Sequence, residues 1–323
     1  GIKGFQVQTR TEDPSEGIAG DFYYNSTTGQ FKTVNDGGPP IGSWSSGGNL
    51  PANYINMGAF GGRDSVTTGG ASSSTARVGD SFQYNGASWS EIAELNTVRD
   101  QTTGLGTQNS GLVAGGQAPS VVGNTENWNG SSWTEVADVS PVRTGAGSAG
   151  VYTAGLIFGG NAPPLTASTM TWNGSSWTEV SDLNAARNRF MGQSVGTQTA
   201  ALAVEGEGVN GTESWNGSTW TEVNDLNTAR HLGSGSGLST SAIVGSGRTG
   251  APGYNPNAAC ESWDGSSWTE VADVSSARAY VGSAGTAAGN NNSESIIFGG
   301  ATTSSTANTA ATEEWNAADF QIK

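Results

Sequence analysis

The stretch Trp128-Asn129-Gly130-Ser131-Ser132-Trp133-Thr134-Glu135-Val136 decides how this chain of 323 residues folds. It returns with little change at Trp172 to Val180, Trp215 to Val223 and Trp263 to Val271. A looser copy runs from Tyr84 to Ile92, and a truncated copy, Trp315-Asn316, lies near the end of the chain. Self-similarity at a fixed spacing is the sequence signature of a repeat architecture. The chain is therefore expected to be built from repeated structural units.

The second tryptophan of each copy measures the length of the repeat. These tryptophans are Trp89, Trp133, Trp177, Trp220 and Trp268, separated by 44, 44, 43 and 48 residues. Ten residues after each comes an arginine: Arg99, Arg143, Arg187, Arg230 and Arg278. A residue present in every repeat is expected to build the repeat rather than bind one ligand. The tryptophans should pack between units, each burying about 150–250 Å². The arginines should pair with a repeated acid (Asp138, Asp182, Asp225 or Asp273) or bind strand-end carbonyl groups.

Each repeat has the features of four short strands. In the copy around Trp177, a Gly-rich stretch from Thr144 to Val151 precedes Leu156-Ile157-Phe158, which ends in a glycine doublet. A loop of variable length leads to a third strand that ends at Trp172. The Asn-Gly pair then forms a tight hairpin, because both residues tolerate positive φ. Four strands in about 44 residues are typical of a β-propeller blade.

The pattern resembles the Kelch repeat over roughly residues 41 to 320. Kelch blades have a glycine doublet after the second strand, then an aromatic residue, then a tryptophan about one short hairpin later. The doublets are Gly69-Gly70, Gly115-Gly116, Gly159-Gly160 and Gly299-Gly300, and the aromatic positions are Tyr84, Trp128, Trp172, Trp215, Trp263 and Trp315. The pattern departs from the family in its shorter hairpin and in the loss of the doublet at Val204-Glu205-Gly206 and Val244-Gly245-Ser246.

Six second-strand landmarks predict six blades, the last of which lacks a fourth strand of its own. Ser43-Trp44 followed by Leu50-Pro51 imitates a fourth strand, and Trp44 lies 45 residues before Trp89. We therefore predict that residues 41–50 complete the blade begun by residues 278–320, which removes the open sheet edges. The expected fold is an all-β, six-bladed, Kelch-like propeller over residues 41–323, preceded by a segment of residues 1–40.

The segment 1–40 does not repeat. Asp21 to Asn25 and Gln30 to Val34 predict a β-hairpin, with a linker at Asp36 to Pro40. The stretch from Pro14 to Gly29 resembles a segment that recurs in tail and fibre proteins of tailed phages. The Trp-Asn-Gly-Ser-Ser-Trp-Thr-Glu-Val repeat is similar to propeller repeats of virion proteins from marine phages. These resemblances imply a location on the virus particle, with the N-terminal segment contacting other virion subunits.

Composition restricts the partners and the chemistry. The net charge of −15 disfavours nucleic acid, because phosphate binding needs clustered cations. No run of 18 apolar residues occurs, so membrane insertion is not expected. Cys260 is the sole cysteine and His231 the sole histidine, which disfavours a metal centre, such as the copper site of Kelch-fold oxidases, and a Ser-His-Asp triad. We expect no cofactor and no bound metal.

The acidic residues do not form a glycosidase-like pair in the sequence. Most recur by position, as in Glu135, Glu179, Glu222 and Glu270, which marks them as parts of the blade. The outliers Asp64, Glu205, Glu207 and Glu294 have no pairing that the sequence predicts. The chain is therefore expected not to be an enzyme, with a glycan-active enzyme as the least favoured alternative.

Loops of variable length indicate where a partner would bind. The loops between second and third strands lie near residues 71–80, 117–125, 161–168, 205–211, 246–260 and 301–311. They should emerge on the face that carries the blade-to-blade connections, and loops on a rigid scaffold are where binding residues concentrate. The longest loop holds the candidate residues Arg248, Tyr254, Asn255 and Asn257.

We expect this face to recognise a host receptor or cell-surface glycan during attachment of a tailed phage. The loops could instead be solvated spacers. A second interpretation is a secreted or surface Kelch-like protein of a bacterium that binds carbohydrate.

Overall fold

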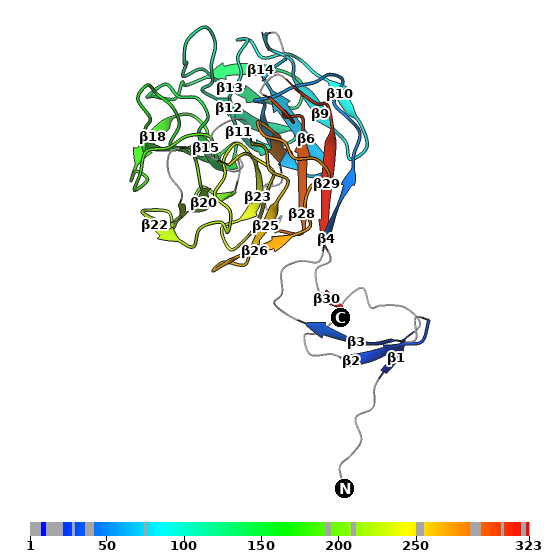
Figure 1. Cartoon of the computed structure of the whole chain (residues 1–323). Coiled ribbons are helices and arrows are strands. Elements are labelled where there is room, and N and C mark those ends of the chain that lie inside the picture. Colours follow the sequence, from blue (N-terminus) through cyan, green and yellow to red (C-terminus); the bar gives the residue numbers. More distant parts are fainter. Residues whose placement is uncertain are drawn as a thin grey trace.

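The computed structural model of the chain describes most of its residues and consists of β-structure. The described residues are 8–10, 22–27, 30–35, 42–73, 76–190, 195–207, 211–249, 255–284, 292–304, 307–317 and 321–322. Six four-stranded antiparallel sheets surround one axis (Figure 1), so the predicted six-bladed propeller is confirmed. Among the described residues no helix is long and apolar enough to cross a membrane.

Each blade is a meander whose first strand is innermost and whose fourth is outermost. Blade 1 consists of β5 (Gly58–Gly62), β6 (Ser65–Gly69), β9 (Phe82–Tyr84) and β10 (Trp89–Glu91), with the small pair β7 (Ala71–Ser72) and β8 (Arg77–Val78) in its loop. Blade 2 consists of β11 (Thr103–Thr107), β12 (Ser110–Ala114), β13 (Thr125–Trp128) and β14 (Trp133–Val136). Blade 3 consists of β15 (Gly147–Val151), β16 (Ala154–Phe158), β17 (Thr169–Trp172) and β18 (Trp177–Val180).

The remaining three blades follow the same order. Blade 4 consists of β19 (Gly196–Thr197), β20 (Ala200–Val204), β21 (Thr212–Trp215) and β22 (Trp220–Val223). Blade 5 consists of β23 (Ser234–Leu238), β24 (Ser241–Gly245), β25 (Cys260–Trp263) and β26 (Trp268–Val271). Blade 6 consists of β27 (Gly282–Ala284), β28 (Glu294–Phe298), β29 (Thr312–Ala317) and β4 (Gly42–Ser46).

The N-terminal strand β4 closes the ring, as the sequence predicted. It pairs antiparallel with β29, and Trp44 lies directly opposite Trp315. The innermost strands contact one another in the order β5, β11, β15, β19, β23 and β27, and β27 contacts β5 again. Glycine permits this close approach: a Cβ atom on Gly104 of β11 would lie 2.4 Å from the carbonyl oxygen of Ala59.

A second, smaller sheet lies outside the ring (Figure 1). The predicted hairpin is present as β2 (Phe22–Asn25) and β3 (Gln30–Asn35). The strand β1 (Gln8–Arg10) adds parallel to β2, and β30 (Gln321–Ile322), near the C-terminal end, adds antiparallel to β3. The sequence did not predict this last pairing, which joins both ends of the chain in one sheet. The predicted linker at residues 36–40 lies outside the described residues.

The hydrophobic core is divided into six clusters, and each cluster lies between two adjacent blades. The tryptophan pairs dominate them. Third-strand and fourth-strand tryptophans face each other across the hairpin, with ring centroids 5.0–5.2 Å apart in blades 2 to 5. In each hairpin an Asn or Asp carboxamide or carboxylate oxygen accepts backbone N–H groups, as Asn129 does from Ser131 and Ser132, while Gly130 takes the positive φ.

Every fourth-strand indole N–H donates a hydrogen bond to the preceding blade. Four of them bind a backbone carbonyl: Trp133 that of Ala93, Trp177 that of Ala137, Trp268 that of Asn224 and Trp44 that of Ala272, at 2.9–3.0 Å. Two bind a threonine hydroxyl: Trp89 that of Thr312 and Trp220 that of Thr169. These six bonds link all neighbouring blades around the ring.

The five repeat arginines are buried, and their acidic partners differ from the expected aspartates. Arg99, Arg187, Arg230 and Arg278 each pair with a third-strand glutamate: Glu126, Glu213, Glu261 and Glu313, respectively. The aspartates instead accept backbone N–H groups, as Asp138 does from Thr125. The glutamates also accept from the turn beside the arginine, as Glu126 does from the backbone and side-chain N–H groups of Asn96. One buried carboxylate thus fixes the turn that enters each blade.

Two blades lack this ion pair. In blade 3, Met170 replaces the glutamate, and Arg143 donates to the carbonyls of Gly159 and Ser168 and to the Ser168 hydroxyl. Burial lowers the pKa of Arg143 to about 10. In blade 1 the pair is aromatic: Tyr54 packs on Phe82 at 5.3 Å.

The buried pairs can be tested by removing one carboxylate. Glu126→Ala should lower the free energy of unfolding by about 3–5 kcal/mol, because it leaves the buried Arg99 guanidinium without its acid. Glu135 lies opposite Glu126 in the same hairpin but is exposed, so Glu135→Ala should change stability by less than about 0.5 kcal/mol. Urea denaturation followed by tryptophan fluorescence measures both, and equal losses would contradict the structural role of the pair.

Candidate ligand-binding site

The blade connections and the variable loops meet on one face of the ring, which we call the loop face. The residue that follows each repeat arginine, or Tyr54 in blade 1, forms a β-bridge with a residue just beyond the second strand. These bridges are Ile55 with Ser72, Asp100 with Gln117, Thr144 with Asn161, Asn188 with Glu207, His231 with Arg248, and Ala279 with Ala301. The strand order predicted this arrangement of loops.

A closed ring of six backbone hydrogen bonds surrounds the axis on the loop face. Its members each lie two positions after the repeat arginine or after Tyr54, and each backbone N–H donates to the carbonyl of the preceding member. They are Asn56, Gln101, Gly145, Arg189, Leu232 and Tyr280, with N–O distances of 2.8–3.2 Å. We call this set the mouth ring.

All six members of the mouth ring have positive φ, between 52° and 61°. This left-handed region favours glycine, yet only Gly145 is a glycine. A non-glycine residue held there costs on the order of 1–2 kcal/mol, and such positions persist where the surrounding structure over-determines them and cluster at functional sites. The ring of hydrogen bonds supplies that constraint.

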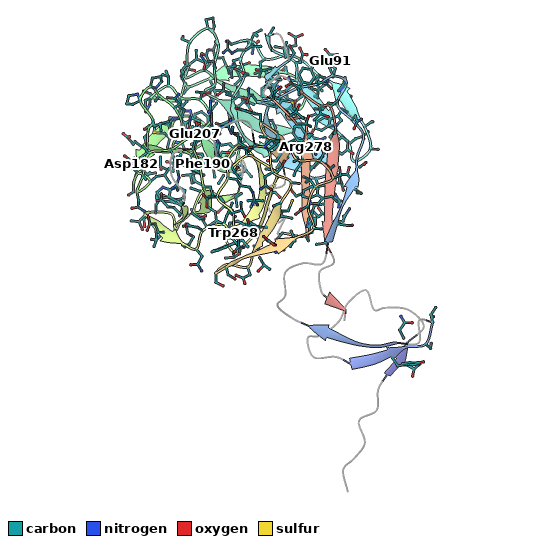
Figure 2. All side chains as sticks on the ribbon, viewed as in Figure 1. Glu91, Asp182, Phe190, Glu207, Trp268 and Arg278 are labelled. Carbon is teal, nitrogen blue, oxygen red and sulfur yellow. The ribbon has the colours of Figure 1, made fainter. Side chains whose placement is uncertain are left out.

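The mouth ring surrounds a hollow of about 460 Å³ that is open to solvent. This volume lies in the range of small-molecule sites, about 300–1,000 Å³. Besides the mouth ring, Phe190 and Val281 line it, and Figure 2 labels Phe190 and Glu207 toward the middle of the ring and Asp182 at its periphery. The lining combines amide groups from blades 1 and 2 with aromatic and aliphatic groups and a guanidinium from blades 4 to 6.

Charged side chains border this hollow on two sides. On the side of blades 4 and 5, Arg189 Nη1 donates to Glu207 Oε2 at 2.7 Å, with both side chains partly exposed. Arg248 Nη1 lies 3.4 Å from the Tyr280 hydroxyl. On the side of blades 1 and 2, the buried carboxylate of Asp100 holds Arg77 at 2.8 Å.

His231 is buried behind the Arg189 side of the hollow. Burial lowers its pKa, with smaller effects from Glu207, Arg248 and Arg189, so its ring is neutral at pH 7. Its Nε2 atom has no hydrogen-bond partner among the described residues. A lone, neutral, buried imidazole offers no nucleophile–base pair of the kind that a catalytic triad requires.

The candidates from the longest loop separate in the structure. Arg248 borders the hollow through Tyr280. Asn257 has a turn role: its N–H donates to the Gly247 carbonyl and its side-chain oxygen accepts the Ala259 N–H. The backbone oxygen of Asn255 accepts the Thr249 N–H, and Tyr254 lies outside the described residues.

The sequence interpretation missed the mouth ring. Its members stand at one fixed offset from a constant arginine, and their identity changes in every copy: Gln101, Gly145, Arg189, Leu232 and Tyr280. Comparing the repeats position by position at this offset would have found them, because a position that varies among otherwise equivalent blades is not needed to build a blade.

The acidic outliers have separate surroundings. Asp64 and Glu294 both lie near Arg63, which follows β5 at the turn to β6. Glu205 occupies the position where four other blades have a glycine, with φ of 50°, and Ser246 does so in blade 5 with φ of 63°. The backbone therefore keeps one conformation where the glycine doublet is lost. Among the described residues no group of three or more His, Cys, Asp or Glu side chains could hold a metal ion.

Glu205 makes stability depend on pH in a defined direction. Burial raises its pKa from 4.5 to about 7, although the Leu226 N–H donates to it. The folded state therefore holds this proton more tightly than the unfolded state, so ionisation destabilises the fold as pH rises from about 4.5 to about 7. Relative to Glu205→Gln, the wild-type protein should lose about 3 kcal/mol of unfolding free energy across that window. Denaturation at a series of pH values measures it, and parallel pH profiles would contradict it.

A scan against protein-family models finds no family that matches this chain, and a search of the curated proteins finds no matching relative. The assignment of the fold therefore stands on the strand order, the register of the hairpins and the closure of the ring. What the loop face binds has to be argued from its side chains.

Proposed function

We propose that this protein is a non-enzymatic recognition module of a tailed-phage particle. In this proposal the loop face binds a receptor or glycan on the host cell surface. The single observation that carries it is the mouth ring: six equivalent backbone positions hold six different side chains around one hollow. Side chains that build the blades, such as the tryptophan pairs, are by contrast nearly constant.

The rigidity of the scaffold supports recognition. The six indole hydrogen bonds and the closed backbone ring hold the mouth in one geometry. A site ordered before binding loses little conformational entropy when a ligand enters. The variable loops around it extend the surface that a partner can contact.

The location on a particle rests on the sequence resemblances. The Pro14 to Gly29 stretch is similar to tail and fibre proteins of tailed phages, and the tryptophan repeat is similar to Kelch-like propellers of marine-phage virion proteins. The sheet β1-β2-β3-β30, which joins both ends of the chain outside the ring, is suited to contact other virion subunits. Such an attachment would leave the loop face available to the host.

A secreted or surface Kelch-like protein of a bacterium is the second candidate, because the same mouth would serve carbohydrate binding in either setting. Purified particles separate the two. The protein should be recovered with particles through a density gradient. Recovery only as free protein, with glycan binding retained, would favour the bacterial candidate.

Selective labelling tests which face binds. The native Cys260 is fully buried and burial raises the pKa of its thiol to about 11, so an introduced surface cysteine will be labelled alone. Ser120 is exposed in the loop between β12 and β13, on the loop face, and Thr153 is exposed in the turn between β15 and β16, on the opposite face. A polyethylene glycol chain on Ser120→Cys should reduce binding to host cells at least tenfold, and the same chain on Thr153→Cys should not.

The assay measures binding of the fluorescent full chain to a panel of bacteria, scored on the strain that the unlabelled protein binds best. Equal binding by both labelled variants would refute recognition through the loop face. Binding lost only with the Thr153→Cys label would move the site to the opposite face.

A further inference from the structure

The positive charge of the propeller is concentrated on the loop face. Residues 42–317 contain no lysine and nine arginines, in a chain with a net charge of −15. Five of these arginines are the buried repeat arginines. Arg63 lies on the opposite face with Asp64, and the other three, Arg77, Arg189 and Arg248, lie on the loop face.

Two of these three arginines reach the same side of the hollow. Arg77 is held by the buried carboxylate of Asp100. Arg189 is itself a member of the mouth ring, and Arg248 approaches Tyr280, another member, at 3.4 Å. The backbone of Arg248 is bridged to His231, next to Leu232, so the two guanidinium groups flank Leu232.

One carboxylate competes with a ligand for these groups. Glu207 pairs with Arg189 at 2.7 Å, and its side chain is 42% exposed. A partly exposed pair of this kind contributes at most about 1 kcal/mol, and a guanidinium has five N–H donors, of which Glu207 uses few. An incoming carboxylate can therefore share or replace Glu207.

The rest of the lining fits a sugar ring. Phe190, Tyr280 and Val281 offer an apolar and aromatic wall, and Asn56 and Gln101 offer amide groups on the opposite side. Amides can donate to and accept from hydroxyl groups, and an aromatic face can cover the C–H groups of a sugar. The guanidinium groups supply the geometry that carboxylates prefer.

We propose, resting on the recognition function above, that the mouth binds an acidic saccharide whose carboxylate is held by Arg189 and Arg248 and whose ring packs on Phe190 and Tyr280. The ligand class is a uronic- or sialic-acid-containing glycan. The mouth selects for the negative charge, and Glu207 limits the affinity.

Matched probes isolate the carboxylate. Calorimetry on the full chain at low salt would compare trigalacturonate with its methyl ester, and sialyllactose with lactose. At least one of the two acids should bind at least tenfold more tightly than its uncharged counterpart. Equal binding of acid and counterpart in both pairs, or no binding of either acid at millimolar concentration, would overturn the proposal.

Three variants then assign the groups. Arg189→Gln and Arg248→Gln should each lower affinity for the acid about 10- to 100-fold, the range expected for a charged hydrogen-bond partner. Glu207→Gln should raise it about 3- to 10-fold, because the competing carboxylate is lost. Arg63→Gln, on the opposite face, is the control and should change nothing. Weaker binding by Glu207→Gln would contradict the competition, and a hexaglutamate peptide that binds as tightly as the saccharide would assign the site to acidic peptides instead.

The outcome is separable from the recognition function. If the Ser120→Cys label blocks cell binding while Arg189→Gln and Arg248→Gln leave it intact, the loop face recognises cells but not through this carboxylate site. If neither label affects cell binding, the recognition function itself fails.

Discussion

The fold depends on the hydrogen bond from each fourth-strand indole to the preceding blade. The same tryptophan stacks on its cross-strand partner, so one side chain fixes the outer hairpin and the angle to the neighbouring blade. Trp44 follows this rule from the other end of the chain by donating to Ala272 of blade 5 while stacking on Trp315. Closure is therefore produced by the same contact as every other junction, and the ring has no open edge that could template aggregation.

The buried Arg–Glu pairs add a second, less uniform constraint. Taking both charges out of water offsets much of their attraction, so such pairs contribute more to a defined geometry than to net stability. The exceptions agree with this account: blade 3 keeps Arg143 on three oxygens, and blade 1 uses Tyr54 on Phe82. The turn that enters each blade is held in all these ways, and that turn positions the mouth ring two residues later.

The repeat length, the number of blades and the closure by residues 42–46 could be predicted from the sequence, because the tryptophan hairpin is a local signal. The partner of the arginines could not, since both the Asp and the Glu recur at fixed offsets and the sequence does not say which one faces the guanidinium. The pairing of β30 with β3 rests on two residues without a pattern. The mouth ring was missed because sequence rules assign positive φ to glycine and asparagine, whereas Arg189, Leu232 and Tyr280 adopt it here.

The strained mouth explains how near-identical blades can form an asymmetric site. If each left-handed position held glycine, the ring would be less strained but would offer no side chains to a ligand. Because each member's N–H and C=O are fixed by its two neighbours, the backbone conformation no longer depends on the residue, and the side chain can change independently in each blade. The hydrogen-bonded ring offsets the strain of five non-glycine residues, and what it makes available is six separately chosen groups directed at one hollow.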